Sequence, residues 1–324
     1  MKNHKKCVLV TGCAGFIGSS FCERFLKEFP KTEVVGIDNF ATGRKDRVIK
    51  GIIFCEGSIT DDLFLEKIFK EYKPEYVFHF AALPRVSFSV ENPAESTLTN
   101  VYGTALLLEK SRDYKVKRFI YSSSSSIYGG AKKLPTKESE NPPDPKSPYA
   151  LQKYAGEPFI QIASKLYGID TVALRYFNVY GPWQYGDSPY STVVSAWLEG
   201  LYFPRNKKLF IEGNGTQSRD FSYIDDVVQA NILAMKAKGN LDGMAMNISS
   251  GERVTLRQIK TLIEKLTGKR LALEKRSPRL GDVLHTMADT KLARRQIGFR
   301  PRIGFEEGIL NTIAWYEKRV RGLS

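Results

Sequence analysis

Histidine and cysteine are scarce in this chain, and long apolar runs are absent from it. Its 324 residues contain three histidines, His4, His79 and His285, which argues against a multi-histidine metal site, so no metal is expected. The cysteines lack metal-ligand spacing and are expected to be free thiols of a reducing compartment; they are Cys7, Cys13, Cys22 and Cys55. No apolar run reaches the roughly 18 residues that span a bilayer, so we expect a cytoplasmic protein.

The chain is basic, with 49 Lys and Arg residues against 35 Asp and Glu residues and a net charge of +14. A charge of this size is compatible with binding to nucleic acid or to an anionic membrane surface. The basic residues are scattered, however, and they form neither a long block nor a pattern interleaved with aromatic residues. We therefore expect no nucleic-acid or membrane partner, and a basic enzyme whose charge assists capture of an anionic substrate.

Apolar strand-like runs alternate with helical patterns in the first half of the chain, which indicates βαβ units. The expected strands are residues 7–10, 34–37, 52–54, 76–80, 118–121, 172–176 and 245–248. The expected helices are residues 17–28, 94–111, 193–201, 225–236 and 256–266 and one that carries Tyr149. The predicted fold class is α/β, with a doubly wound parallel sheet in residues 1–177 and a smaller C-terminal α/β substrate domain in residues 178–324. A segment of the latter, about 222–250, is expected to return to the first domain.

Three glycines, Gly12, Gly15 and Gly18, stand between the first expected strand and the first expected helix. Glycines there allow a tight turn and close approach of the backbone to a pyrophosphate, which the helix N-terminus then faces. Asp38 follows 20 residues after Gly18, at the end of the second strand, where an acid accepts hydrogen bonds from a ribose 2′-hydroxyl. A carboxylate repels a 2′-phosphate, so NAD is favoured over NADP, although Arg44 nearby leaves NADP open.

Tyr149 and Lys153 are four residues apart, which places them on one face of a helix. A free tyrosine has a pKa of about 10, and a neighbouring ammonium group favours the phenolate and makes it a usable base. Five serines, 122–126, follow the expected strand 118–121. They stand at a strand's carboxyl end, where doubly wound sheets bind ligands, so a catalytic role is favoured over a linker.

These motifs together resemble the extended short-chain dehydrogenase/reductase superfamily. They are the glycine turn, Ala81-Ala82, the serine run followed by Tyr128-Gly129, Tyr149-x-x-x-Lys153, and the stretches 175–182, 213–226 and 279–282. Within its NAD-dependent epimerase/dehydratase family, the chain most resembles UDP-hexose 4-epimerases. The resemblance implies a Rossmann fold and a catalytic set in which Tyr149 is the base, Lys153 holds the cofactor ribose and lowers the tyrosine pKa, and Ser124 binds the sugar 4-oxygen.

The resemblance also implies which residues contact NAD. They are Gly12, Gly15, Phe16, Ile17, Gly18, Asp38, Asn39, Ser58, Ile59, Ala81, Ala82, Asn100, Ser122, Tyr149, Lys153, Tyr176 and Val179. One position departs from the family pattern, because Ser58 follows Gly57 where the family often has an aspartate near the adenine. The hydroxyl of Ser58 and the backbone amide of Ile59 are expected to take that place.

For the nucleotide sugar, the resemblance assigns a further set of residues to three parts of the ligand. Asn178, Arg219 and Arg279 would bind the diphosphate, Asp282 the ribose, and Val193, Trp197 and Phe210 the uracil. Thr286 matches a gate beside the hexose, where a small side chain admits an N-acetyl group. Arg85, together with Ser124 and Tyr149, would face the sugar, and Arg85 could read a C6 carboxylate.

The expected activity is therefore C4 epimerisation of UDP-N-acetylglucosamine and UDP-N-acetylgalactosamine, with UDP-glucose and UDP-galactose as a further candidate pair. A UDP-uronate 4-epimerase stays open through Arg85. Related dehydratases and decarboxylases carry a glutamate two residues before Tyr128, often with a preceding aspartate in the dehydratases, where this chain has Ser126 and Ser125, so those activities rank lower.

A non-catalytic module that binds RNA or a protein partner is the remaining alternative. The presence of Tyr149, Lys153 and Ser124 argues against it. The family pairs two subunits through two helices, which correspond to residues 94–111 and 149–166 here, so a homodimer is expected.

Overall fold

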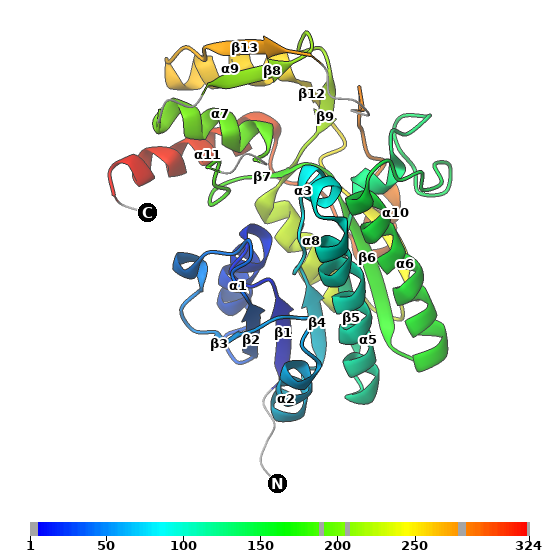
Figure 1. Cartoon of the computed structure of the whole chain (residues 1–324). Helices are drawn as coiled ribbons and strands as arrows, with labels where there is room; N and C mark the ends of the chain where they lie inside the picture. The colour runs from blue at the N-terminus through cyan, green and yellow to red at the C-terminus, as the bar shows by residue number, and fades with distance from the viewer. Residues whose placement is uncertain (1–5, 188–190, 205–207, 278–282, 323–324) are drawn as a thin grey trace.

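The computed structural model describes residues 6–187, 191–204, 208–277 and 283–322 (Figure 1). Within them, seven strands form one parallel sheet in the order β11-β6-β5-β4-β1-β2-β3. The strands are β1 (Cys7–Thr11), β2 (Glu33–Asp38), β3 (Ile53–Glu56), β4 (Tyr76–His79), β5 (Arg118–Ser124), β6 (Asp170–Tyr176) and β11 (Met244–Ile248). The strand order reverses between β1 and β4, and such a switch point is where doubly wound sheets bind ligands. The predicted fold class is confirmed.

Helices cover both faces of this sheet, as its near-continuous apolar strands require. On one face α1 (Phe16–Glu28) packs against α8 (Ile224–Lys236), and on the other α2 (Asp62–Tyr72), α5 (Gly103–Asp113) and α6 (Pro148–Tyr167) pack side by side. Each face has its own apolar core, one that includes Phe21 and Val227 and another that includes Leu107 and Ile160. None of the helices in the described ranges is long and apolar enough to cross a membrane.

The remaining elements lie beyond the carboxyl edge of the sheet, as Figure 1 shows for α7, α9, α11 and the pair β8–β13. The strands there pair as β7 (Val179–Tyr180) with β10 (Ser222–Tyr223), β8 (Leu209–Glu212) with β13 (Leu273–Arg276), and β9 (Ser218–Asp220) with β12 (Arg253–Thr255). The helices there are α7 (Val193–Tyr202), α9 (Leu256–Thr267) and α11 (Phe305–Val320), whereas α10 (Lys291–Ile297) packs against β11 and α8. β11 pairs with β6, so the chain returns to the large sheet after β10.

The prediction of one helix at residues 94–111 is wrong in one respect, because this segment is not a uniform α-helix. It consists of α4 (Pro93–Thr97), a π-helical turn η2 (Leu98–Tyr102) and α5. Asn100 lies in that turn, and its side chain bonds the backbone of Leu83 in both directions and donates to Gln152 Oε1 at 2.8 Å. These tertiary hydrogen bonds favour the extra residue in the turn, which the sequence pattern does not reveal. The short helices η1 (Lys45–Arg47), α3 (Val86–Glu91) and η3 (Ser125–Tyr128) were not predicted.

Candidate active site

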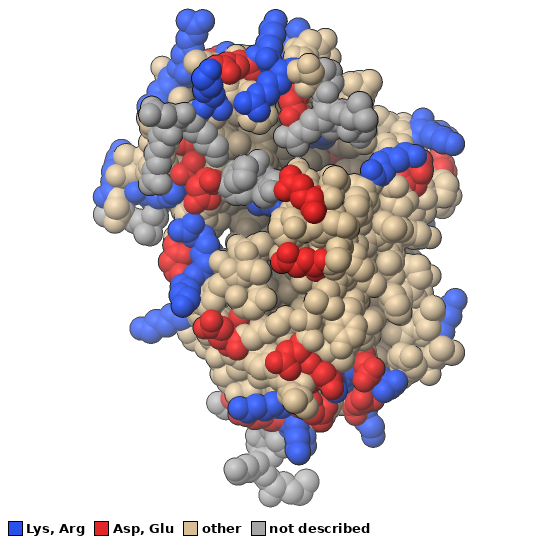
Figure 2. Space-filling model, in the orientation of Figure 1, with Lys and Arg blue, Asp and Glu red and all other residues tan. Residues whose placement is uncertain are grey.

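A cavity of about 1550 Å³ opens between the carboxyl edge of the sheet and the elements beyond it. Figure 2 shows the molecule hollowed between its upper and lower parts, with basic and acidic side chains interspersed around the opening rather than gathered in one basic block. The cavity is lined by residues that follow β1, β2, β4, β5 and β6 and by residues of α7, β8 and β9. A site of this size can hold a dinucleotide beside a second ligand. Among the described residues, no cluster of His, Cys, Asp and Glu side chains could hold a metal ion.

The glycine turn forms one end of this cavity and fits a pyrophosphate. Gly12 has a φ of +71°, and a Cβ there would lie 2.7 Å from the backbone nitrogen of Ala81. A Cβ on Gly18 would lie 2.0 Å from the Gly12 carbonyl oxygen, so the helix and the turn can pack this closely only through glycine. Gly15 precedes the first turn of α1 and lines the cavity. The backbone N–H groups at the start of α1 are therefore presented to a bound anion.

Asp38 ends β2 beside this turn, as predicted. Its carboxylate accepts hydrogen bonds from the backbone of Ala14 at 3.0 Å and of Phe40 at 2.8 Å, and it lines the cavity. Burial raises the pKa of Asp38, and these backbone hydrogen bonds oppose the rise. Arg44, which left NADP open, forms ion pairs with Asp46 at 3.1 Å and Asp187 at 3.2 Å. The arginine is thus engaged elsewhere, and the carboxylate suits the ribose of NAD.

Tyr149 and Ser124 come together in the cavity from α6 and from the end of β5. Ser147 caps α6 by accepting from the backbone of Ala150 at 3.2 Å, and the backbone N–H of Tyr149 donates to Ser89 Oγ of α3 at 3.0 Å. Burial raises the pKa of Tyr149, whereas a hydrogen bond with Ser124 and the charge of Arg85 lower it. The phenol and the Ser124 hydroxyl therefore meet at one point of the cavity, where both could bond the same ligand oxygen.

Lys153 lies one turn further along α6, and its side chain is buried behind the cavity wall. Its ammonium group donates to the carbonyl oxygen of Ser122 at 2.8 Å and lies 5.1 Å from the ring centroid of Tyr121. Burial lowers the pKa of Lys153 to about 7. Arg85 supplies a charge that lowers the pKa of the phenol. The effect of Lys153 on the pKa of Tyr149 stays a prediction for the site with NAD bound.

A buried polar network lies behind these groups and joins α6 to β5 and β6. Glu157 of α6 pairs with Arg175 of β6 through both carboxylate oxygens, at 2.9 and 2.6 Å, and it accepts from Ser123 Oγ of β5 at 2.6 Å. Arg175 also donates to the hydroxyl of Tyr128 at 2.7 Å, which donates to Asn247 of β11 at 2.7 Å. This network fixes the helix that carries Tyr149 relative to the strand that carries Ser124.

Most of the predicted cofactor and substrate residues line the cavity. For the cofactor these are Gly12, Gly15, Phe16, Ile17, Gly18, Asp38, Asn39, Ser58, Ile59, Ala81, Ala82, Tyr149, Tyr176 and Val179, and for the substrate Arg85, Ser124, Asn178, Val193, Trp197, Phe210, Arg219 and Thr286. Asn100, Ser122 and Lys153 do not line it and lie behind its wall. Arg279 and Asp282 lie outside the described residues.

The residues predicted to bind the uridine diphosphate are held at the opposite end of the cavity. Trp197 Nε1 donates to the carbonyl oxygen of Phe210 at 3.1 Å, which joins α7 to β8. Thr286, which was predicted as the gate beside the hexose, accepts through Oγ1 from the backbone N–H of Asp220 at 3.1 Å. Sequence analysis missed Arg276 of β13, whose guanidinium stacks 3.8 Å from the Phe210 ring centroid and lines the cavity. Only the pairing of β13 with β8 brings Arg276 there, so no local signal marks it.

The chain is similar over nearly its whole length to enzymes that are named for the sugar nucleotides on which they act. Residues 8–249 match the model of the NAD dependent epimerase/dehydratase family. UDP-glucose 4-epimerase from Thermotoga maritima, solved with UDP-glucose, is 37% identical and superposes with a TM-score of 0.91 over 97% of this chain and 99% of that chain. UDP-N-acetylglucosamine 4-epimerase from Methanobrevibacter ruminantium M1 is 33% identical, with a TM-score of 0.88 over 97% of this chain and 99% of that chain.

A third relative carries a different sugar in its name. UDP-glucuronate 4-epimerase from Thermodesulfobacterium geofontis is 34% identical over 323 residues, which are 96% of this chain and 96% of that protein. The family that the motifs predict is confirmed by the family match and by these identities. The chain therefore belongs to the NAD-dependent epimerase/dehydratase family within the extended short-chain dehydrogenase/reductase superfamily, and its cofactor is NAD.

Proposed function

We propose that this protein inverts the configuration at C4 of a UDP-hexose through a transient 4-keto sugar, with UDP-N-acetylglucosamine and UDP-N-acetylgalactosamine as its main substrates. The observation that carries the proposal is the meeting of Tyr149 and Ser124 in a cavity that also holds the glycine turn and Asp38. NAD, when bound, accepts a hydride from C4 and returns it. In this proposal, residues 1–177 form the domain that binds NAD, and residues 178–324 form the domain that binds the sugar nucleotide.

The chain's own residues supply the proton chemistry and the orientation. Tyr149 takes the proton of the 4-hydroxyl as the C4–H bond is broken, and gives it back to the 4-oxygen after the ring has turned over. Ser124 donates a hydrogen bond to that oxygen in both half-reactions. In this proposal Lys153, whose ammonium group donates to the carbonyl oxygen of Ser122, holds the ribose of the cofactor. No net oxidation occurs, because the hydride returns to the carbon that it left.

Thr286 supports an N-acetylated sugar, because it presents a small side chain to the cavity. The remaining substrate contacts in this proposal come from Asn178 and Arg219 at the diphosphate and from the pocket of Val193, Trp197 and Phe210 at the uracil, joined by Arg279 and Asp282. Dehydration and decarboxylation of the sugar are disfavoured. Related enzymes that catalyse them carry carboxylates at the positions of Ser125 and Ser126, and a hydroxyl does not transfer protons as a carboxylate does near neutral pH.

The test is to incubate the purified protein separately with UDP-glucose, UDP-N-acetylglucosamine and UDP-glucuronate and to resolve the products by NMR and mass spectrometry. We expect interconversion at C4 with unchanged mass and without added NAD, fastest for the N-acetylated pair. Loss of water or carbon dioxide from the sugar would instead identify a lyase. Preference for UDP-glucuronate would make the enzyme a uronate epimerase and would assign Arg85 to the C6 carboxylate.

Replacing Arg85 should shift the pH dependence of the reaction. The positive charge of Arg85 favours the phenolate, so Arg85→Met is expected to raise the pKa of Tyr149. The acid limb of the kcat profile then moves to higher pH, and the deficit relative to wild type shrinks as the pH rises. Arg85→Lys, which keeps the charge, is the matched control. An unchanged profile with a neutral hexose would remove Arg85 from this role.

We also propose that the protein is a homodimer that pairs through η2 and α6. Large apolar side chains are exposed on these two neighbouring helices, which an isolated chain would leave in water. They are Leu98, Tyr102, Leu151, Phe159, Ile162 and Leu166. Sedimentation velocity would measure the mass, and a monomer at micromolar concentration would contradict the proposal.

A further inference from the structure

Two loops from distant parts of the chain meet at the cofactor end of the cavity. One follows β2 and includes η1, and the other follows β7. We call their contact the clasp, and it consists of Arg44, Asp46, Arg47, Trp183, Tyr185 and Asp187. None of the residues assigned above to the cofactor or the substrate belongs to this contact.

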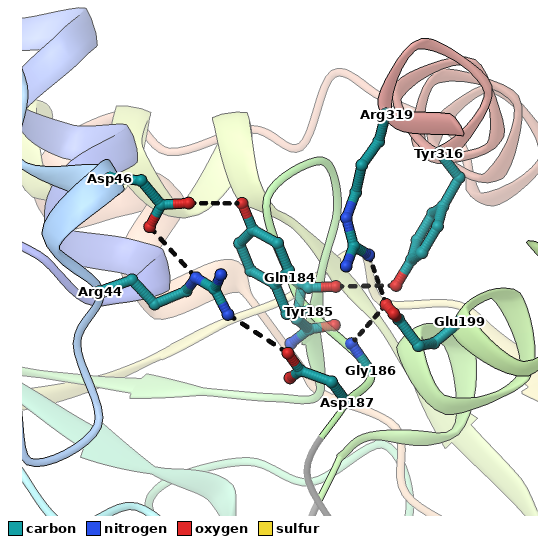
Figure 3. Close-up of polar contacts among 9 residues, drawn as sticks. All are labelled: Arg44, Asp46, Gln184, Tyr185, Gly186, Asp187, Glu199, Tyr316 and Arg319. Atoms are coloured by element: carbon teal, nitrogen blue, oxygen red, sulfur yellow. Dashed lines mark hydrogen bonds and ion pairs between the residues drawn. The ribbon is translucent and has the colours of Figure 1, made fainter. Parts of the chain in front are cut away.

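Arg44 is the centre of the clasp, as Figure 3 shows. Its guanidinium pairs with Asp46 at 3.1 Å on its own loop and with Asp187 at 3.2 Å on the other loop. The same group stacks 3.9 Å from the ring centroid of Tyr185, whose hydroxyl donates to Asp46 Oδ2 at 3.4 Å. Arg44, Asp46 and Tyr185 thus form a closed set of contacts between the two loops, and Asp187 adds a second ion pair across them.

A second stacked pair reinforces the first. Arg47 is buried, and its guanidinium lies 3.9 Å from the ring centroid of Trp183. Its Nε and Nη2 atoms donate to Ser19 Oγ at 3.2 and 2.9 Å, which attaches the clasp to α1. The clasp therefore rests on the helix whose N-terminus faces the cavity.

The loop that carries Tyr185 is itself anchored from behind. The hydroxyl of Tyr316 on α11 donates to the carbonyl oxygen of Gln184 at 3.1 Å, and the backbone of Gly186 donates to Glu199 of α7 at 3.3 Å (Figure 3). Arg319 of α11 pairs with Glu199, and its guanidinium lies 4.7 Å from the Tyr185 ring centroid. Tyr185 is thus held between two arginines, one from each side of the contact.

The position of the clasp relates it to the cofactor. The backbone N–H of Arg44 donates to the carbonyl oxygen of Ala14 at 3.0 Å, so the clasp is attached directly to the glycine turn. Arg44, Arg47, Trp183, Tyr185 and Asp187 all line the cavity that contains Asp38. A dinucleotide held at the turn and at Asp38 would leave past these side chains.

The ionic groups of the clasp are partly exposed to solvent. The side chains of Arg44, Asp46 and Asp187 are 42%, 55% and 46% exposed, so their ionic contacts are screened by water and salt. The stacked contacts to Tyr185 and Trp183 depend less on ionic strength. The ionic contacts of Arg44 can therefore break while Trp183 and Tyr185 stay packed against Trp315 and the apolar core.

We propose that this clasp retains NAD, and that its opening limits the exchange of the cofactor with solution. An enzyme that returns its hydride to the sugar has no need to exchange the cofactor in each cycle, and in this respect the inference rests on the proposed function. Retention keeps the reduced cofactor beside the 4-keto sugar until the hydride has returned.

The test measures exchange of bound NAD rather than turnover. Purified protein is mixed with an excess of isotopically labelled NAD, and the bound fraction is followed by rapid gel filtration and mass spectrometry. Tyr185→Ala and Arg44→Ala are each expected to accelerate exchange by about tenfold, as loss of a stacked cation allows. Tyr185→Phe keeps the ring and should exchange at nearly the wild-type rate. Higher salt should accelerate exchange in the wild type more than in Arg44→Ala.

Lys269→Ala is the matched control, because Lys269 stacks 4.2 Å from the Tyr202 ring centroid outside the cavity. Arg44 is half exposed, so its replacement tests the clasp even if Tyr185→Ala were to fold poorly. Exchange at the wild-type rate in folded Arg44→Ala, equal acceleration in Lys269→Ala, or a wild-type protein that loses its NAD on gel filtration would overturn the proposal. A failure of C4 epimerisation would leave these exchange rates unchanged, so the two proposals fail separately.

Discussion

Tyr149→Phe is expected to lower kcat by about a thousandfold, the usual contribution of a positioned acid–base group. The substitution removes one oxygen and keeps the ring, so the protein should fold and bind NAD as before. The effect should fall on kcat rather than on KM, because the phenolic oxygen acts on the proton that moves in the chemical step. Steady-state rates over a range of pH, together with the NAD content of the purified variant, provide the measurement.

Ser124→Ala is the natural companion, because it leaves the phenol in place and removes the hydroxyl that bonds it. Loss of this bond should reduce the rate less than loss of the phenol, and it should raise the pKa of Tyr149, which moves the acid limb of the profile to higher pH. Turnover of Tyr149→Phe at the wild-type rate would remove the tyrosine from its proposed role.

In the proposed mechanism, the electrostatic balance at Tyr149 would make the phenol a better base once the cofactor is bound. Burial raises the pKa of the phenol, and the hydrogen bond with Ser124 and the charge of Arg85 oppose that rise. Lys153 is held against a carbonyl, with a pKa lowered to about 7 by burial. A cationic ligand group beside the phenol would favour its ionised form, so chemistry and cofactor binding are coupled in this site.

The sheet and the glycine turn could be predicted because their signals are local. Alternating apolar runs and glycines at fixed spacing depend on neighbours in the sequence, and the structure places Gly12, Gly18 and Asp38 as the pattern required. Helix α2 has a local signal as well, namely Asp61 as its N-cap residue. The Asp61 carboxylate accepts from the backbone N–H of Phe64 at 3.0 Å.

Contacts between distant segments could not be predicted in this way. The charge of Arg85 on Tyr149 depends on how α3 packs against α6, which are joined by Ser89 and the Tyr149 backbone. The π-helical turn depends on Asn100 meeting Leu83 and Gln152. Each of these pairings is set by the folded arrangement of helices, for which one sequence carries no direct signal.

Breaking the buried pair between Glu157 and Arg175 is expected to be the most destabilising single change in the site. The two residues are 2% and 6% exposed, and removing one partner leaves the other as an uncompensated buried charge. Arg175→Met should therefore cost about 3–5 kcal/mol in the free energy of unfolding. The double variant Glu157→Leu, Arg175→Met should be less destabilised than the sum of the single variants, because it buries no lone charge.

Urea unfolding of the two single variants, the double variant and a surface control measures these differences. Glu28→Gln is the control, because it breaks the exposed pair with Arg24 on α1 and should cost less than about 1 kcal/mol. Additive effects of Glu157→Leu and Arg175→Met would contradict a coupled pair. The double variant should still have a reduced kcat, since Glu157 also accepts from Ser123 at 2.6 Å and so aligns β5 with α6. A stable double variant with full activity would mean that packing alone places Ser124 against Tyr149. A stable double variant with a reduced kcat would show that the polar network orients Ser124 and Tyr149 in addition to its effect on folding.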